Sequence, residues 1–121
     1  MITLLGKALV FLTVEGLKNE ASRVESILRQ LYFDVTLLCG LTCDKMAKVM
    51  DKVAKEKHEG NAFVMVFIGH GQNEKILGYG EQPGDELAIV SEVVDRFSNK
   101  GSPTLMNKPK IFIFNCCRES K

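Results

Sequence analysis

Residues 62–71 read Ala-Phe-Val-Met-Val-Phe-Ile-Gly-His-Gly, seven apolar residues followed by a histidine between two glycines. An apolar run this short, with several β-branched side chains, favours a buried strand over a helix. Residues 111–118, Ile-Phe-Ile-Phe-Asn-Cys-Cys-Arg, repeat the arrangement, because a second apolar run breaks off into polar and thiol side chains. The sequence therefore predicts two buried strands that each end in chemically reactive residues.

Outward from these two runs, apolar strands alternate with amphipathic helices. The predicted strands are 7–13, 33–38, 62–68, a short 75–79 and 110–114. Apolar residues at i, i+3, i+4 and i+7 predict helices at 19–31, 43–59 and 86–99. The side chains expected to face the core are Val24, Ile27, Leu28, Leu31, Met46, Val49, Met50, Val53, Ile89, Val90, Val93, Val94 and Phe97. This alternation predicts a three-layer α/β fold, a mainly parallel sheet with helices on both faces.

Length and composition restrict the class of protein. The 121 residues predict one domain over 1–121, with 45% hydrophobic and 26% charged residues. A formal net charge of +1 gives no basic field for a phosphate backbone, so nucleic acid is not expected as a partner. The apolar residues 1–14 lack the flanks of a signal peptide, and no run approaches the ~20 apolar residues of a membrane span. We expect a soluble cytoplasmic protein without membrane contact.

The four cysteines do not form an evident disulfide framework. Cys116 and Cys117 are adjacent, and neighbouring strand residues point to opposite faces. The pair is therefore poorly placed to hold the fold together through disulfides. Cys39 and Cys43 have no matching cysteine or histidine pair with zinc spacing, so we expect reduced thiols and no metal. No Gly-x-Gly-x-x-Gly follows the first strand, which disfavours a nucleotide cofactor, and no cofactor is expected.

The candidate site lies where two strands end. In parallel sheets the chemistry sits at the carboxyl ends of the strands, so His70 and Cys117 are expected to share one crevice. A thiol beside an imidazole is a nucleophile with its base, and the backbone N–H groups of Gly71 and Cys117 could form an oxyanion hole. The plainer alternatives are a turn histidine between glycines and an ordinary core or surface thiol.

Two segments, residues 63–71 and residues 108–118, together resemble the large subunit of caspases. That family's signature is Gln-Ala-Cys-Arg-Gly with a histidine roughly 50 residues upstream. The resemblance extends from near Gly6, through Gly40-Leu41-Thr42, to Arg118. It implies a caspase-like large-subunit domain in which Cys117 is the nucleophile, His70 the base, Gly71 an oxyanion donor and Cys116 a packing residue.

The same resemblance implies partners and a role. Caspases pair a large with a small subunit and join two such heterodimers, so a small subunit and a dimer are expected. Protein or peptide substrates, cleaved after aspartate, and programmed cell death or inflammatory signalling are implied in the same way. Residues 74–86 are interpreted as an ordinary surface hairpin.

Three departures concern the recognition of aspartate. The arginine that caspases carry soon after the first strand falls in residues 14–19, which contain none. Lys18 or Arg23 could substitute, but lysine lacks the planar fork that grips a carboxylate. Asn115 stands at the substrate-pocket position of the signature glutamine, and Glu119 replaces the glycine. Two hypotheses stay open: an active cysteine endopeptidase, or a catalytically weak homologue that regulates an active caspase by binding it.

Overall fold

A computed structural model describes residues 3–117. The long elements are β1 (Gly6–Leu12), α1 (Lys18–Gln30), β2 (Phe33–Cys39), α2 (Cys43–Lys55), β3 (Ala62–Gln72) and β6 (Lys110–Cys117). Two short strands, β4 (Lys75–Leu77) and β5 (Glu86–Ala88), lie between β3 and β6 in sequence. A 3-10 turn at Glu15–Leu17 leads into α1.

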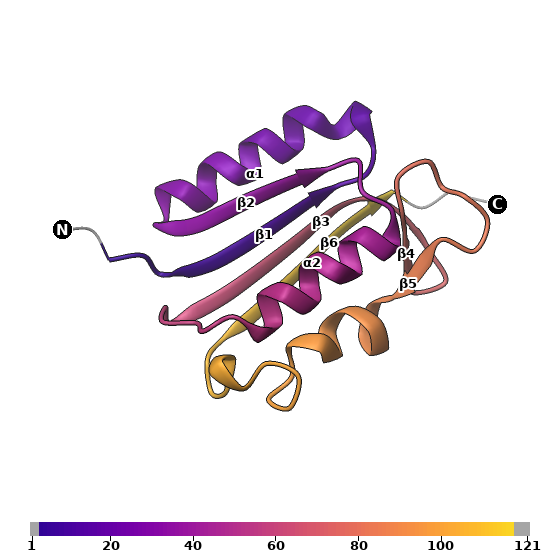
Figure 1. The fold of residues 1–121 in the computed structure, drawn as a ribbon. Coiled ribbons are helices and arrows are strands. Elements are labelled where there is room, and N and C mark those ends of the chain that lie inside the picture. Colours follow the sequence, from indigo (N-terminus) through magenta and orange to yellow (C-terminus); the bar gives the residue numbers. More distant parts are fainter. Residues whose placement is uncertain (1–2, 118–121) are drawn as a thin grey trace.

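The sheet is mainly parallel, as predicted. Its order is β2-β1-β3-β4-β5, and β6 pairs with β3. The four long strands β2, β1, β3 and β6 all run in one direction, which Figure 1 shows as arrows lying side by side. The strands β4 and β5 add an antiparallel extension to the end of β3. The carboxyl ends of β3 and β6 therefore share one edge.

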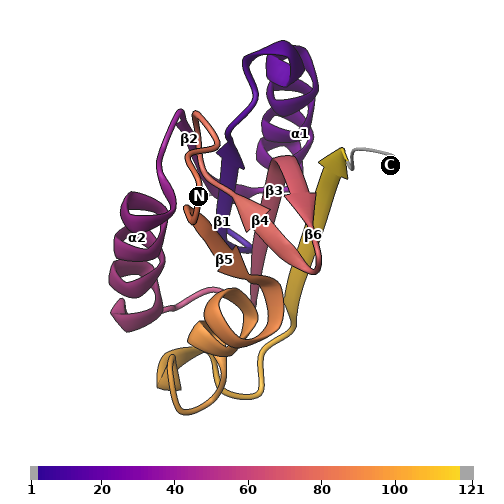
Figure 2. The ribbon, with the colours of Figure 1, turned by 90° about the vertical axis from the view of Figure 1, so that its right-hand side faces the viewer.

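Helices cover both faces of this sheet. Figures 1 and 2 show α1 on one face and α2 on the other, where the segment between β5 and β6 lies beside it. Alternate residues of β3 enter two different cores: Phe63, Met65 and Phe67 pack on the α2 side, and Val64 and Val66 on the α1 side. Strands buried on both faces read as continuous apolar runs, which is why the strand pattern identified them.

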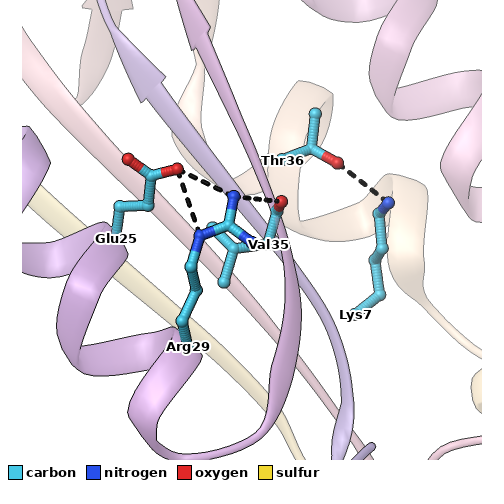
Figure 3. Close-up of polar contacts among 5 residues, drawn as sticks. All are labelled: Lys7, Glu25, Arg29, Val35 and Thr36. Carbon is cyan, nitrogen blue, oxygen red and sulfur yellow. Dashed lines mark hydrogen bonds and ion pairs between the residues drawn. The ribbon is translucent and has the colours of Figure 1, made fainter.

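Polar contacts connect α1 and β1 to the edge strand β2 (Figure 3). Arg29 Nη2 donates to Glu25 Oε2 at 2.8 Å and to the Val35 carbonyl at 3.3 Å. Lys7 Nζ donates to Thr36 Oγ1 at 2.9 Å. Surface ion pairs of this kind are worth about 0–1 kcal/mol, so the apolar clusters, and not these bonds, supply most of the stability.

The predicted helix at 86–99 is wrong. Its first residues form β5 and pair with β4, and a π-helical turn (Ile89–Val93) and a 3-10 turn (Val94–Phe97) follow. Pairing with β4 satisfies the backbone of residues 86–88, so it removes the first helical turn. Phe97 is buried and stacks on Phe63 with ring centroids 4.5 Å apart, whereas Val90, expected to face inward, is 61% exposed.

Smaller differences concern the ends and faces of other elements. The second helix ends at Lys55 and not at 59, because Glu56 is already extended. On α1, Leu28 and Ala21 are buried, while Ile27 and the C-cap residue Leu31, both expected in the core, are exposed. The narrow contact of α1 with the sheet explains this, since a helix on a sheet buries only one stripe.

Candidate active site

The backbone brings His70 and Cys117 together. The strand β3 continues four residues past its predicted end at 68, and β6 three residues past its predicted end at 114. In the parallel pairing of these strands His70 is the register partner of Cys117. Adjacent strands lie about 4.8 Å apart, so the two residues are direct neighbours across the sheet. The side chain of Cys117, and all of Arg118 and Glu119, lie outside the described residues.

The glycines beside His70 serve close packing and not a tight turn. Gly69 and Gly71 both lie within β3, which does not end at residue 68 as predicted. A Cβ at Gly69 would overlap Thr13 Oγ1, and one at Gly71 would lie 2.9 Å from the Lys75 carbonyl oxygen and 3.0 Å from Cys116 Sγ. Side chains at either position would push β3 away from its neighbours.

A small pocket opens beside the imidazole. Its volume is about 200 Å³, and its lining includes His70, Gly71, Gln72 and Glu81. His70 Nδ1 contacts Glu81 Oε2, and the side chains are 34% and 42% exposed, respectively. Glu86, also in the lining, pairs with Lys75 at 3.1 Å. The pocket therefore holds an imidazole with one carboxylate on its Nδ1 atom.

The sequence does not predict this contact, because residues 74–86 indicate only an ordinary surface hairpin. Glu81 reaches His70 through a turn in which Gly80, Glu81 and Gly84 have φ values of 83°, 50° and 82°. The N–H of Glu81 donates to the Gly78 carbonyl at 3.0 Å and closes that turn. The glycines signalled a loop but could not show which acidic residue the loop would bring back to β3. The segment is a hairpin, as predicted, but its turn also brings Glu81 to His70.

The remaining candidate residues are more scattered. Asn115 is the register partner of Ile68 and is exposed. Gly71 is buried and pairs with Ile76 of β4. Lys18 and Arg23, the possible substitutes for a missing arginine, are both exposed on α1, where Lys18 is the first residue. A second pocket of about 200 Å³ at the ends of β1 and β2 includes Thr13, Cys39 and Tyr79 in its lining.

The other described thiols differ in environment. Cys116 packs against the core on the α2 side, which confirms its expected packing role. Cys43 is buried, its Sγ lies 3.8 Å from the Ile76 carbonyl, and burial followed by the charge of Asp85 raises its pKa to about 12. Cys43 is thus an inert thiol at neutral pH. Within residues 3–117 no group of three or more His, Cys, Asp or Glu side chains could hold a metal ion.

Another pocket lies at the opposite end of the strands. It measures about 660 Å³ and is lined partly by the charged residues Lys7, Asp34 and Glu56. These side chains include the surface pair of Lys7 with Asp34, and no cysteine is among the described residues that line the pocket. Among the helices that the structure describes, none is long and apolar enough to cross a bilayer.

Comparison with known proteins identifies the family of this chain. A family model for the caspase domain matches residues 10–121. The chain belongs to the caspase family. This match confirms the resemblance to caspases and the caspase-like α/β fold. The neighbouring residues His70 and Cys117 therefore lie in a domain that belongs to a protease family.

Curated relatives of this caspase-family chain share about a quarter of its residues. Caspase-6 of Gallus gallus is 27% identical over 107 residues, which are 88% of this chain and 34% of that protein. Caspase-3 of Bos taurus is 27% identical over 104 residues, 85% of this chain and 36% of that protein. Cell death protein 3 of Caenorhabditis remanei is 26% identical over 107 residues, 88% of this chain and 20% of that protein. The chain spans about a third of the length of the two caspases.

Proposed function

We propose that this chain is the part of a cysteine endopeptidase that carries the nucleophile Cys117 and the general base His70. The observation that supports it most strongly is the register pairing of these two residues at the carboxyl edge of adjacent parallel strands. Membership of the caspase family supports peptide-bond hydrolysis as the chemistry.

The proposed reaction has two steps. The imidazole of His70 takes the proton of the Cys117 thiol, and the thiolate attacks the carbonyl carbon of the scissile peptide bond. The N–H groups of Gly71 and Cys117 stabilise the oxyanion that forms. The C–N bond then breaks, and the imidazolium gives its proton to the amine that leaves. Water hydrolyses the thioester that remains and regenerates the thiol.

A partner chain completes the proposed enzyme. The described part of β6 pairs only with β3, and Ile111 and Ile113 on this edge strand are 47% and 49% exposed. An exposed edge with apolar side chains favours strand addition by another chain. We propose that a caspase small subunit docks there and that two such heterodimers associate, in the cytoplasm, within a cell-death or inflammatory pathway.

The first test is peptide hydrolysis. The chain, assembled with the remainder of its caspase domain, is assayed on fluorogenic peptides varied at the residue before the cut. We expect hydrolysis that Cys117→Ala and His70→Ala abolish and that Cys39→Ala, at an exposed thiol outside the proposed dyad, leaves unchanged. Hydrolysis that persists in Cys117→Ala would remove the proposal.

One observation favours a second candidate, a catalytically weak homologue that regulates an active caspase by binding. Residues 14–19 contain no arginine, and in the structure they form a 3-10 turn followed directly by α1. The loss of a buried bidentate partner weakens binding of an anionic side chain by about 2–5 kcal/mol. Efficient cleavage after aspartate would exclude this candidate, whereas an inactive, folded assembly that binds an active caspase would favour it.

A further inference from the structure

In the contact between Glu81 and His70, the chemistry of the carboxylate determines which group donates the hydrogen bond. A carboxylate can only accept a hydrogen bond, so the proton in the contact sits on His70 Nδ1. The neutral imidazole then has its lone pair on Nε2. A base that keeps one defined nitrogen available is the arrangement that nucleophile–histidine sites need.

We infer that Glu81 is a positioning residue for His70, which fixes the tautomer and orientation of the imidazole so that Nε2 serves as the base. This inference rests on the proposed dyad and extends it to a nucleophile, a base and a carboxylate that orients the base. The carboxylate also stabilises the imidazolium that forms when the thiol gives up its proton.

The pocket contains only one other described carboxylate, and it is already engaged. Glu86 Oε1 accepts from Lys75 Nζ at 3.1 Å, across the two strands of the β4–β5 hairpin. Glu81 instead projects from the turn between those strands, where the bond from its N–H to the Gly78 carbonyl holds the backbone. The turn therefore presents one particular carboxylate to the imidazole.

The two histidines of the chain provide an internal reference. His58 Nε2 lies 2.7 Å from the Val53 carbonyl oxygen, which is also an acceptor, so His58 carries its proton on Nε2. The structure thus assigns opposite tautomers to His58 and His70. Nitrogen-15 chemical shifts of the neutral imidazoles distinguish the two forms, and labelling this chain alone within the assembled protein restricts the signals to these two residues.

The experiment compares Glu81→Ala, Glu81→Gln and a control, Glu74→Ala. Glu74 lies in the turn between β3 and β4, and its backbone carbonyl, which accepts from Ile89, is unaffected by the substitution. We expect the wild type to show the Nδ1–H tautomer at His70, Glu81→Ala to lose it, and Glu81→Gln to retain it, because the amide oxygen still accepts. His58 keeps the Nε2–H form in every variant.

Kinetics provide the second readout. Loss of base orientation should lower kcat by about tenfold or more in Glu81→Ala with KM changed less than about twofold, and Glu81→Gln should recover part of kcat. Circular dichroism and melting temperature establish that each variant is folded.

Several results would overturn the inference. They are an Nε2–H tautomer at His70 in the wild type, an unchanged tautomer in Glu81→Ala, or a higher kcat in Glu81→Ala, which would mean that the carboxylate obstructs the base. If Cys117→Ala leaves hydrolysis intact, the proposed function fails, while the tautomer of His70 in Glu81→Ala still decides the positioning role of Glu81.

Discussion

The residues with thiol chemistry occupy very different environments in this chain. Cys43, the first residue of α2, is 3% exposed and its thiol faces Ile76 of β4, whereas Cys39 is exposed at the end of β2. Cys116 packs against the core beside Gly71. Environment, and not residue type, therefore decides which cysteine of a protein can react.

Cys43 leads to a prediction about alkaline pH. Its folded pKa is raised from 9.0 to about 12, so below pH 9 both states hold the proton and the contribution to stability is fully present. Above pH 9 the unfolded chain loses the proton first, and the stability falls until the pH passes the folded pKa. We expect the free energy of unfolding, measured by urea denaturation, to fall more steeply between these values in the wild type than in Cys43→Ala.

The matched control is Cys39→Ala, which removes an exposed thiol and should keep the wild-type slope. The wild type and Cys43→Ala differ at one side chain, so the difference between their slopes isolates Cys43. Equal slopes in Cys43→Ala and the wild type would contradict the role of burial.

At the residue scale, the sequence predicted the positions of His70 and Cys117 but not the group that contacts the histidine. Both positions follow from apolar runs that end at the same edge of a parallel sheet, which is a local pattern combined with a topological rule. Glu81 reaches His70 through a turn whose backbone enters the left-handed region at Gly80, Glu81 and Gly84. No periodicity in the sequence encodes where such a turn directs a side chain.

Among the elements, the long strands and the first two helices were predictable because their apolar spacing is strong. The segment 86–99 was not, although its pattern is helical. The strand β5 forms there by pairing with β4. The paired residues are nine positions apart between Leu77 and Glu86 and thirteen apart between Lys75 and Ala88. Tertiary pairing overrides a local helical preference in such a case.

The close approach of β3 to the chain after β1 depends on Gly69. We expect Gly69→Ala to lower the free energy of unfolding by about 1–3 kcal/mol, because its Cβ would overlap the buried Thr13 hydroxyl. Gly16→Ala is the control, since a Cβ there meets nothing within 4 Å. Its effect should stay within about 1 kcal/mol, and it can be stabilising.

Urea denaturation of both variants measures this difference. Equal effects of the two substitutions would show that β3 can move away from Thr13 at no cost. Hydrolysis by Gly69→Ala should also fall, because the substitution displaces the strand that carries His70.

On the scale of the whole molecule, the sheet edge at β6 combines exposed apolar side chains with a strand that has only β3 as its partner among the described residues. The helices cover the central strands on both sides, but Ile111 and Ile113 on β6 are exposed beside an open strand edge. A net charge of +1 provides little repulsion between copies. Exposed apolar edges of this kind promote association.

We therefore expect the isolated chain to self-associate through β6. Ile113→Lys should shift its sedimentation profile towards monomer, because a charge on an edge strand opposes pairing. Ile27→Lys is the matched control, since Ile27 is equally apolar and 55% exposed but lies on α1. A monodisperse wild-type monomer, or an equal effect of both variants, would contradict this prediction.

The register of β6 also selects between two chemically identical groups. Because Cys116 and Cys117 are adjacent, a slip of one residue against β3 would set Cys116 opposite His70. The same slip would turn Phe112 and Phe114 out of the core on the α2 side and bring Ile111 and Ile113 in. The preference of two phenylalanines for one face thus determines which of two neighbouring cysteines lies opposite His70 in the register. Substitutions at these aromatic positions could exchange the thiols without altering either cysteine.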